Sequence, residues 1–375
     1  MADLSLTSAQ ELLRTTARDF IERECSLAQV RRIDEEEDGF SRELWQRTAA
    51  LGWPRLLVPA AYGGAGGSLT DAAVLYEEIG RGLLPGPQHS SAVLAAQVLL
   101  RAGSEAQRQR LLPAIARGER IVTVAFTEAR YGWTPDHVQM TARPRDGGYV
   151  LAGGKQLVPD AGAADEIIVA ARTDGGLTLL LVDTNAPGVE RRIMRGFVGE
   201  PLYEVSFRNV EVSRDAVVGE PGRGWDALEP AFDVATAVLC ASMAGACRRV
   251  YELSLAYAQR RVQFGQPIAR FQRVQDRLIE MVNHADAARL TAYEAVWKLE
   301  QRRPDAQAGV SVAKAVASEG FYESCEHAHH VHGGIGSDKA YGLYLYTKAS
   351  RSLYHYLGSP DHHRRRLARL LGLGG

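Results

Sequence analysis

An arginine, an amide and an aromatic ring lie close together in the chain at Arg261, Gln263 and Phe264. A guanidinium can donate two parallel hydrogen bonds to a phosphate, an amide can bind a base or a phosphate, and a ring can stack. A Gly-Gln-Pro turn follows at 265–267, and apolar residues then recur at helical spacing over 271–281. The spacing predicts two helices joined at a corner that could bind a nucleotide. Taken alone, the same residues also fit a plain helical hairpin with a salt bridge at its corner.

The elements that must position this corner follow from the pattern of the whole chain. Its 375 residues predict two or three subdomains, and 46% hydrophobic and 24% charged residues are ordinary for a globular protein. We expect an α+β fold with a helical domain over 1–119, a central β-barrel-like domain over 120–221 and a four-helix bundle over 222–375. Strands are expected near 121–126 and over 166–172, 177–183 and 202–212. Helices are expected over 68–81, 90–101, 225–261, 268–301, 305–330, 340–356 and 361–371.

Composition argues against several classes of function. The net charge is -1 and no basic block stands out, so we expect no nucleic-acid partner. The four cysteines are widely separated and form no CxxC pair, which argues against a zinc site and a disulfide framework and favours the cytoplasm. No signal pattern and no apolar run of membrane length is evident, so no membrane association is expected.

Three stretches carry a resemblance to a known family. The run R-x-Q-F-G-x-P-I from Arg261, the turn His330–Gly336 (HVHGGIG) and the segment Leu51–Arg81 (LGW, VP, YGG, EEIGR) resemble the acyl-CoA dehydrogenase family. The resemblance covers nearly the whole chain, in the right order. It implies helical, β and helical domains in sequence, FAD as the cofactor and an acyl-CoA thioester as the substrate.

The resemblance also implies which residues contact FAD. Arg261, Gln263 and Phe264 would hold the ADP half of a neighbouring subunit's FAD. The glycine turn would face the same neighbour through Gly333 and Gly334, with His330 in place of the family's Gln. The FAD contacts expected within the chain's own subunit are these: Thr127 of the Thr127-Glu128 pair at the flavin, and Thr134 beside Trp133, which replaces a serine at the pyrophosphate.

The residues expected to perform the chemistry are replaced. The family removes a proton from Cα with a glutamate while Cβ delivers a hydride to the flavin. The two positions at which members carry that glutamate are Leu357 and Ala235 here, so we expect no catalytic base from either. The family's W-I-T/S motif becomes 157–159, Leu-Val-Pro. Asp361 is the nearest acid in sequence to Leu357, but Ser359-Pro360-Asp361 reads better as a helix start.

These losses lead to several hypotheses. The first is an FAD-dependent acyl-CoA dehydrogenase subunit that lacks the base, as in the bacterial heterotetramers that act on steroid-like or other bulky acyl-CoAs, which the HGGIG turn and the C-terminal sequence resemble. The second is a homo-oligomer, such as a homotetramer, that uses Asp361 or another acid. The third is a flavin-dependent monooxygenase or another non-dehydrogenase of the same fold, and the fourth is a non-catalytic partner subunit. The family usually passes electrons to an electron-transfer flavoprotein. The sequence does not disclose the acyl group.

Overall fold

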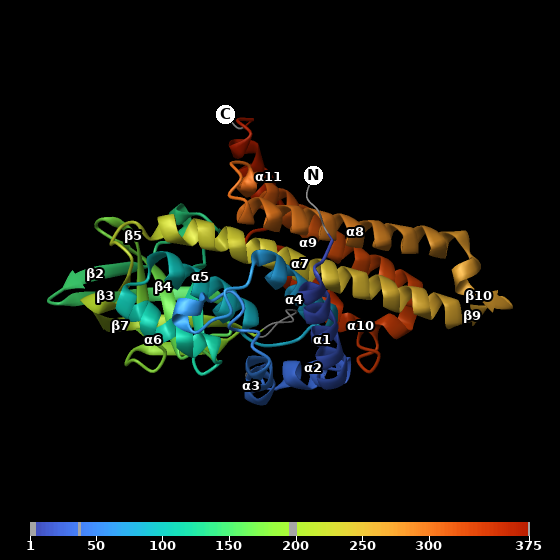
Figure 1. Ribbon diagram of the computed structural model, residues 1–375, viewed down its shortest axis with the longest axis horizontal. Coiled ribbons are helices and arrows are strands. Elements are labelled where there is room, and N and C mark those ends of the chain that lie inside the picture. Colours follow the sequence, from blue (N-terminus) through green and yellow to red (C-terminus); the bar gives the residue numbers. More distant parts are fainter. Residues whose placement is uncertain (1–4, 37–38, 195–200, 374–375) are drawn as a thin grey trace.

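The computed structural model describes residues 5–36, 39–194 and 201–373. Short helices precede a sheet, and a bundle of long helices follows it; the sheet lies at one end of the molecule (Figure 1). The helices before the sheet are α1 (Ser8–Glu24), α2 (Leu27–Glu35), α3 (Arg42–Ala50), α4 (Leu69–Gly82), a π-helix (Gln88–Ala95), α5 (Ala96–Ala102) and α6 (Glu105–Ala116).

Local sequence signals explain where the first helices begin. Thr7 caps α1, since its hydroxyl accepts from the Gln10 backbone amide while the Gln10 side chain accepts from the Thr7 amide. This reciprocal pair is a capping box, and it fixes the start of the helix. The helix expected over 90–101 differs in detail, because it opens as a π-helix at Gln88 and becomes α-helical only at Ala96. Pro87 removes a backbone donor there and fixes the entry of the chain.

The central part is one sheet of eight strands. These are β1 (Val122–Ala125), β2 (Thr141–Arg145), β3 (Gly148–Pro159), β4 (Glu166–Thr173), β5 (Gly176–Asp183), β6 (Val189–Ile193), β7 (Leu202–Ser213) and β8 (Val217–Val218). Their order is β6-β7-β3-β2-β4-β5-β8, and β1 pairs in parallel with β4. The strands expected over 166–172, 177–183 and 202–212 are confirmed as β4, β5 and β7. The sheet has edges at β6 and β8, so it is more open than the expected barrel.

The C-terminal part is a helical bundle joined to a small hairpin. It comprises α7 (Gly224–Arg260), β9 (Val262–Gln263), β10 (Gln266–Pro267), α8 (Gln272–Glu300), α9 (Ala306–His332), α10 (Leu343–His355) and α11 (Pro360–Leu370). Figure 1 shows α7 running from the sheet to the hairpin, which lies at the opposite end of the molecule. The expected four-helix bundle is present as the long helices α7, α8 and α9 and the shorter α10, with α11 packed on α9.

The long helix α7 is the apolar centre of the bundle. It is long and apolar enough to cross a membrane by length and composition alone, which the sequence reading did not anticipate. However, 89% of its most apolar window is buried inside the protein, as expected of a core helix. The crossing with α4 is close because it uses glycines: a Cβ on Gly80 would lie 1.8 Å from the Ser242 carbonyl oxygen, and one on Gly245 equally near that of Glu77.

A buried lysine lies inside the bundle, behind the end of α10. The Nζ atom of Lys314 donates hydrogen bonds to the Ser318 hydroxyl at 2.8 Å and to the Leu353 carbonyl oxygen at 2.9 Å. No carboxylate among the described residues forms an ion pair with it. Burial lowers the pKa of Lys314 to about 7. The lysine therefore ties the last carbonyls of α10 to α9.

This lysine should make stability depend on pH. Its pKa is lower in the folded than in the unfolded chain, so between about pH 7 and 10 the unfolded state binds more protons and the free energy of unfolding rises with pH. The slope is at most about 1.4 kcal/mol per pH unit. We expect Lys314→Met to lose this contribution, which urea unfolding of both proteins at pH 7.0, 7.75 and 8.5 would measure. A wild-type-minus-variant difference that is constant over this range would contradict the assignment.

Candidate functional site

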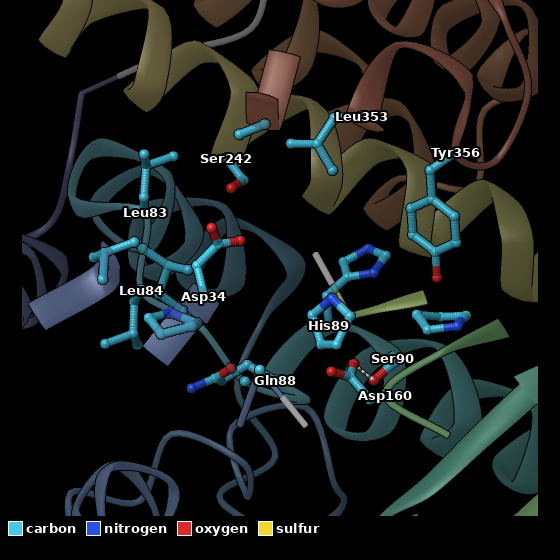
Figure 2. Close-up of a pocket in the computed structure, with 18 of the residues that line it drawn as sticks. Asp34, Leu83, Leu84, Gln88, His89, Ser90, Asp160, Ser242, Leu353 and Tyr356 are labelled. Atoms are coloured by element: carbon cyan, nitrogen blue, oxygen red, sulfur yellow. Dashed lines mark hydrogen bonds between the residues drawn. The ribbon is translucent and has the colours of Figure 1, made fainter. Parts of the chain in front are cut away.

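A cavity of about 260 Å³ lies where the N-terminal helices, the end of β3, α7 and α10 meet. We call it the junction cavity, and its lining includes Leu84, Gln88, His89, Ser90, Asp160, Leu239, Leu353 and Tyr356. Figure 2 shows Gln88, His89, Ser90 and Asp160 toward one side and the polar Asp34 and Ser242 apart from them, with Leu353 and Tyr356 entering from the bundle. Leucines and polar groups therefore line the same pocket.

The first turn of the π-helix supplies three of these polar groups, Gln88, His89 and Ser90. The Nε2 atom of His89 lies 2.8 Å from the carbonyl oxygen of Ala235, the residue at one of the two missing-glutamate positions. Because a carbonyl only accepts, Nε2 carries the hydrogen and Nδ1 carries a lone pair. Burial lowers the pKa of His89 to about 4, so the ring is neutral. Its ring also packs edge-to-face on Tyr356, at 5.6 Å between centroids.

Asp160 is the fourth of these polar groups, and sequence reasoning missed it. It follows the 157–159 segment directly, with a positive φ of 56° that places its carboxyl at the cavity wall. The Ser90 hydroxyl donates to its Oδ2 at 2.5 Å (Figure 2). Burial raises the pKa of Asp160 to about 6. Among the described residues no cation pairs with this carboxyl. A bound ligand could therefore change the protonation state of Asp160. The one sequence signal that could have identified Asp160 is its position directly after 157–159, the segment that replaces the family's W-I-T/S motif.

A row of aromatic rings borders the junction cavity. Trp133 stacks on Phe126 at 5.8 Å and 13°, and it packs edge-to-face on Phe232 and Tyr356 at 5.4 and 5.8 Å. Its Nε1 donates to the Tyr131 hydroxyl at 2.7 Å. An indole therefore fills the place of the small serine that the resemblance assigns to FAD pyrophosphate.

Leu357 lies on the other side of this row, at a second cavity of about 200 Å³. Trp133, Thr134, Thr236 and Leu357 are among the residues that line it. Leu357 is buried and has a φ of 59°, and its carbonyl oxygen lies 2.9 Å from His363 Nε2. Ala235 is fully buried as well. Neither position therefore offers a proton acceptor.

Asp361 lies outside both cavities. Its side chain is 77% exposed and lies 3.7 Å from Arg364 on the same helix. The Ser359 hydroxyl accepts from the His362 amide, and Pro360 is the first residue of α11. This geometry is that of a helix start, as the sequence indicated.

The flavin-side threonines are engaged within the chain. Thr127 is buried, and its hydroxyl donates to the Gln156 carbonyl oxygen. Thr134 lies 2.7 Å from His137 Nδ1. The partner of Thr127 in the sequence motif, Glu128, binds the buried Lys155 at 2.6 Å. These contacts hold the turn after β1 in place.

The nucleotide-binding corner predicted from the sequence is an exposed hairpin at the far end of the bundle. Arg261 follows α7, and its guanidinium forms an ion pair with no carboxylate of the described residues. Phe264 has a φ of 51° and is 92% exposed, and Gln263 is exposed beside it. The plainer interpretation of the sequence was a helical hairpin with a salt bridge at its corner, and Arg261 does not form such a salt bridge within the described residues. The corner therefore presents a cation, an amide and a ring outward.

The glycine turn lies at the same end. His332, at the end of α9, stacks on Tyr257 of α7 at 4.6 Å, and Tyr257 accepts from the backbone amide of Arg261. A Cβ on Gly333 or Gly334 would meet no atom within 4 Å, and His330 is exposed one turn earlier. The backbone at this turn is therefore open to an approaching group.

The structure thus separates the predicted FAD contacts into two sets. Thr127 and Thr134 belong to the sheet end of the molecule, whereas the hairpin lies at the opposite end (Figure 1). The glycine turn belongs to the hairpin set. One chain does not bring the two sets together, so a single FAD could contact both only across two chains.

Comparisons with known proteins agree with this architecture. Residues 7–119, 123–210 and 222–372 match the N-terminal, middle and C-terminal domains of acyl-CoA dehydrogenase. A 3-(aryl)acrylate reductase of Clostridium sporogenes is 30% identical over 369 residues, covering 95% of this chain and 96% of that one.

Solved structures agree over the full length. The ChsE4-ChsE5 complex from Mycobacterium tuberculosis contains a chain that is 28% identical, with a TM-score of 0.91 and complete coverage of both chains. The FAD complex of PigA is also 28% identical, with a TM-score of 0.92 and complete coverage of both chains. The chain belongs to the acyl-CoA dehydrogenase family, whose members are FAD-dependent oxidoreductases.

Proposed function

We propose that this chain is the base-lacking subunit of a heteromeric acyl-CoA dehydrogenase, in which it completes an FAD site of its partner. One observation carries the proposal: the hairpin end exposes groups that can bind a nucleotide, whereas the sheet end has no catalytic base at the two family positions. The ChsE4-ChsE5 complex, a relative made of two different chains, supports a heteromeric arrangement. A heterotetramer is the assembly we expect.

The hairpin end fits a dinucleotide. Arg261 is an exposed guanidinium without a carboxylate partner among the described residues, which suits a pyrophosphate. Phe264 offers an exposed ring to a planar base, and Gln263 offers an amide. The bare backbone at Gly333 and Gly334 allows close approach, with His330 at its side. These residues would bind the adenosine diphosphate part of a partner's FAD.

The sheet end fits a flavin poorly. The Thr127 hydroxyl donates to a carbonyl oxygen of the chain, and the indole of Trp133 packs against four rings. Leu357 and Ala235 cannot accept a proton. We therefore assign Thr127 and Thr134 no flavin contact in the free chain, and no step of the reaction is assigned to the sheet end.

The chemistry divides between two chains in this proposal. FAD, when bound, accepts the hydride from Cβ of the acyl thioester, and a carboxylate of the partner removes the proton from Cα. This chain contributes phosphate binding and excludes water from one side of the interface.

Electron-transfer flavoprotein is the expected electron acceptor. The four buried, unpaired cysteines support a cytoplasmic enzyme. The proposed domain boundaries remain 1–119, 120–221 and 222–375.

The test compares the chain alone with the chain co-expressed with a homologue that carries the glutamate. We expect the pure chain to show little flavin absorbance and no bleaching during anaerobic titration with a panel of acyl-CoAs. The co-purified complex should be yellow and should bleach. Flavin content per chain and turnover with an artificial electron acceptor are the measurements.

Full dehydrogenase activity of the chain alone would overturn the proposal. Asp160 and His89, which line the junction cavity, would then be the first residues to replace, and Asp361→Asn would test the remaining acid. Consumption of oxygen with added reduced flavin, without bleaching by acyl-CoA, would instead favour a monooxygenase. A colourless complex that does not turn over would leave only a structural role.

A further inference from the structure

The segment between β1 and β2 crosses from the sheet to the bundle, and we call its residues 129–138 the strap. The Tyr131 hydroxyl donates to the carbonyl oxygen of His355, the last residue of α10, at 2.6 Å. The same hydroxyl accepts from Trp133 Nε1 at 2.7 Å. One tyrosine therefore fastens the strap to the bundle and also fixes the orientation of the indole.

The far end of the strap is bound to the sheet. The Arg172 guanidinium of β4 donates to the carbonyl oxygens of Val138 and Pro135 at 2.7 and 2.9 Å. The Glu128 carboxylate, before the strap, accepts from the amide of Gln139, just after it, at 2.8 Å. The base of the strap is therefore held by the sheet and does not depend on the bundle.

The tip of the strap has a fixed shape of its own. A Cβ on Gly132 would lie 2.2 Å from the His137 ring, so the chain can fold over this histidine only because residue 132 is a glycine. The Thr134 hydroxyl lies 2.7 Å from His137 Nδ1 and closes the same turn. Tyr131, whose hydroxyl holds the tip on α10, is 39% exposed. The tip can therefore leave the bundle as a unit when this bond and the ring contacts of Trp133 break.

Trp133 is the part of the tip that enters the protein. Its side chain is buried between Phe126, which follows β1, and the rings of Phe232 on α7 and Tyr356 after α10. An indole is much larger than the serine that the resemblance places here at the FAD pyrophosphate. With the strap on the bundle, the residue present at this position therefore does not fit the cofactor that the family implies.

We propose that the strap is a latch that closes the chain's own sheet end to FAD: Tyr131 fastens it to α10, and Trp133 blocks the cofactor. The sheet end is closed while the tip lies on the bundle, and it opens to a dinucleotide when the tip moves away on its sheet-bound base. The inference rests on the proposed function in one respect, that the free chain carries no flavin, and it names the residues responsible.

Trp133 accounts for this closure better than the other altered residues of the sheet end. The change from W-I-T/S to Leu157, Val158 and Pro159 removes polar contacts, and the loss of a hydrogen bond weakens binding by a finite factor. A ring packed tightly into the space of a ligand excludes that ligand until the ring moves. We therefore assign the larger effect to Trp133.

The first test restores a small side chain at the block. Trp133→Ser, in the full chain purified alone, should bind FAD about tenfold more tightly than the unaltered chain, measured by flavin fluorescence at equilibrium. Trp225→Ser is the matched control, because Trp225 lines the same cavity beside Leu357 but lies on α7, outside the strap. This control should leave the FAD affinity unchanged. No gain with Trp133→Ser, or an equal gain with both variants, would overturn the block.

The second test reads the latch without any ligand. Tyr131→Phe keeps the ring but removes the hydroxyl that joins the strap to α10, so trypsin should cleave after the exposed Arg130 about fivefold faster than in the unaltered chain. Cleavage after Arg145, in the exposed turn that follows β2, is the internal reference. Tyr346→Phe is the matched control, since its hydroxyl also donates to a backbone carbonyl oxygen, that of Arg81, at 2.7 Å.

The outcomes separate the latch from the heteromeric proposal. Should Trp133→Ser not fold, Tyr131→Phe still decides, because its proteolysis is measured without flavin. Unchanged cleavage after Arg130 in Tyr131→Phe, or an equal rise in Tyr346→Phe, would overturn the latch and leave the base-lacking heteromer standing. Dehydrogenase activity of the unaltered chain alone would instead overturn both, since the chain would then hold flavin with the strap in place.

Discussion

Replacing Arg261 by Gln is expected to lower the affinity of the heteromeric complex for FAD by roughly 30- to 150-fold. The guanidinium is exposed, forms no ion pair within the described residues and lies at the corner between α7 and α8. Losing charge-assisted hydrogen bonds to a phosphate costs about 2–3 kcal/mol, which corresponds to that range. Flavin fluorescence during titration of the flavin-free complex with FAD measures the affinity.

Arg273→Gln provides the control for this prediction. Arg273 is also an exposed arginine at the hairpin end of the bundle, but it pairs with Asp276 on its own helix at 3.2 Å. Removing it changes the net charge equally, so a general electrostatic effect would weaken both variants alike. Equal FAD affinity of Arg261→Gln and the unaltered complex would contradict the assignment of the hairpin to the cofactor.

Much of the fold could be predicted because local signals and packing agree. Alternating apolar residues gave β4, β5 and β7 to within about a residue, and Gly-Pro punctuation gave the hairpin after α7. The π-helix at Gln88 could not be predicted, because its 88–95 segment has an ordinary helical composition. Its conformation is set by contacts with Val122 and Ala235, which are far away in the sequence.

The candidate site was only partly predictable, for a similar reason. Motif spacing located Arg261, Phe264 and the glycine turn, since each lies in a short continuous run. Asp160 and His89 line the same cavity only because β3, the π-helix and α7 pack together in the fold. No local sequence pattern predicts this packing. Trp133 could be recognised as a replacement, but its stacking on Phe126 required the structure.

The second large effect is expected from Arg366→Met, at a buried ion pair between α11 and α7. The two guanidinium nitrogens of Arg366 lie 2.5 and 3.0 Å from the two carboxylate oxygens of Asp233, and both side chains are largely buried. The variant leaves Asp233 buried with only the Gln307 amide at 3.3 Å. We expect the free energy of unfolding to fall by about 3–5 kcal/mol, measured by urea unfolding.

Two further variants show whether the unpaired charge is the cause. Arg364→Met removes an exposed arginine of the same helix, paired with Glu319, and should cost at most about 1 kcal/mol. The double variant Arg366→Met/Asp233→Leu removes both buried charges. It should recover most of the stability because the one carboxylate that then loses Arg366, Glu229 at 3.5 Å, is 38% exposed rather than buried. If the double variant is as unstable as Arg366→Met, the loss comes from packing between α11 and α7. The pair lines the cavity beside Leu357, whose carbonyl oxygen also lies 2.9 Å from Nε2 of His363 in α11, so α11 contacts both α7 and the segment in which the family's glutamate is missing.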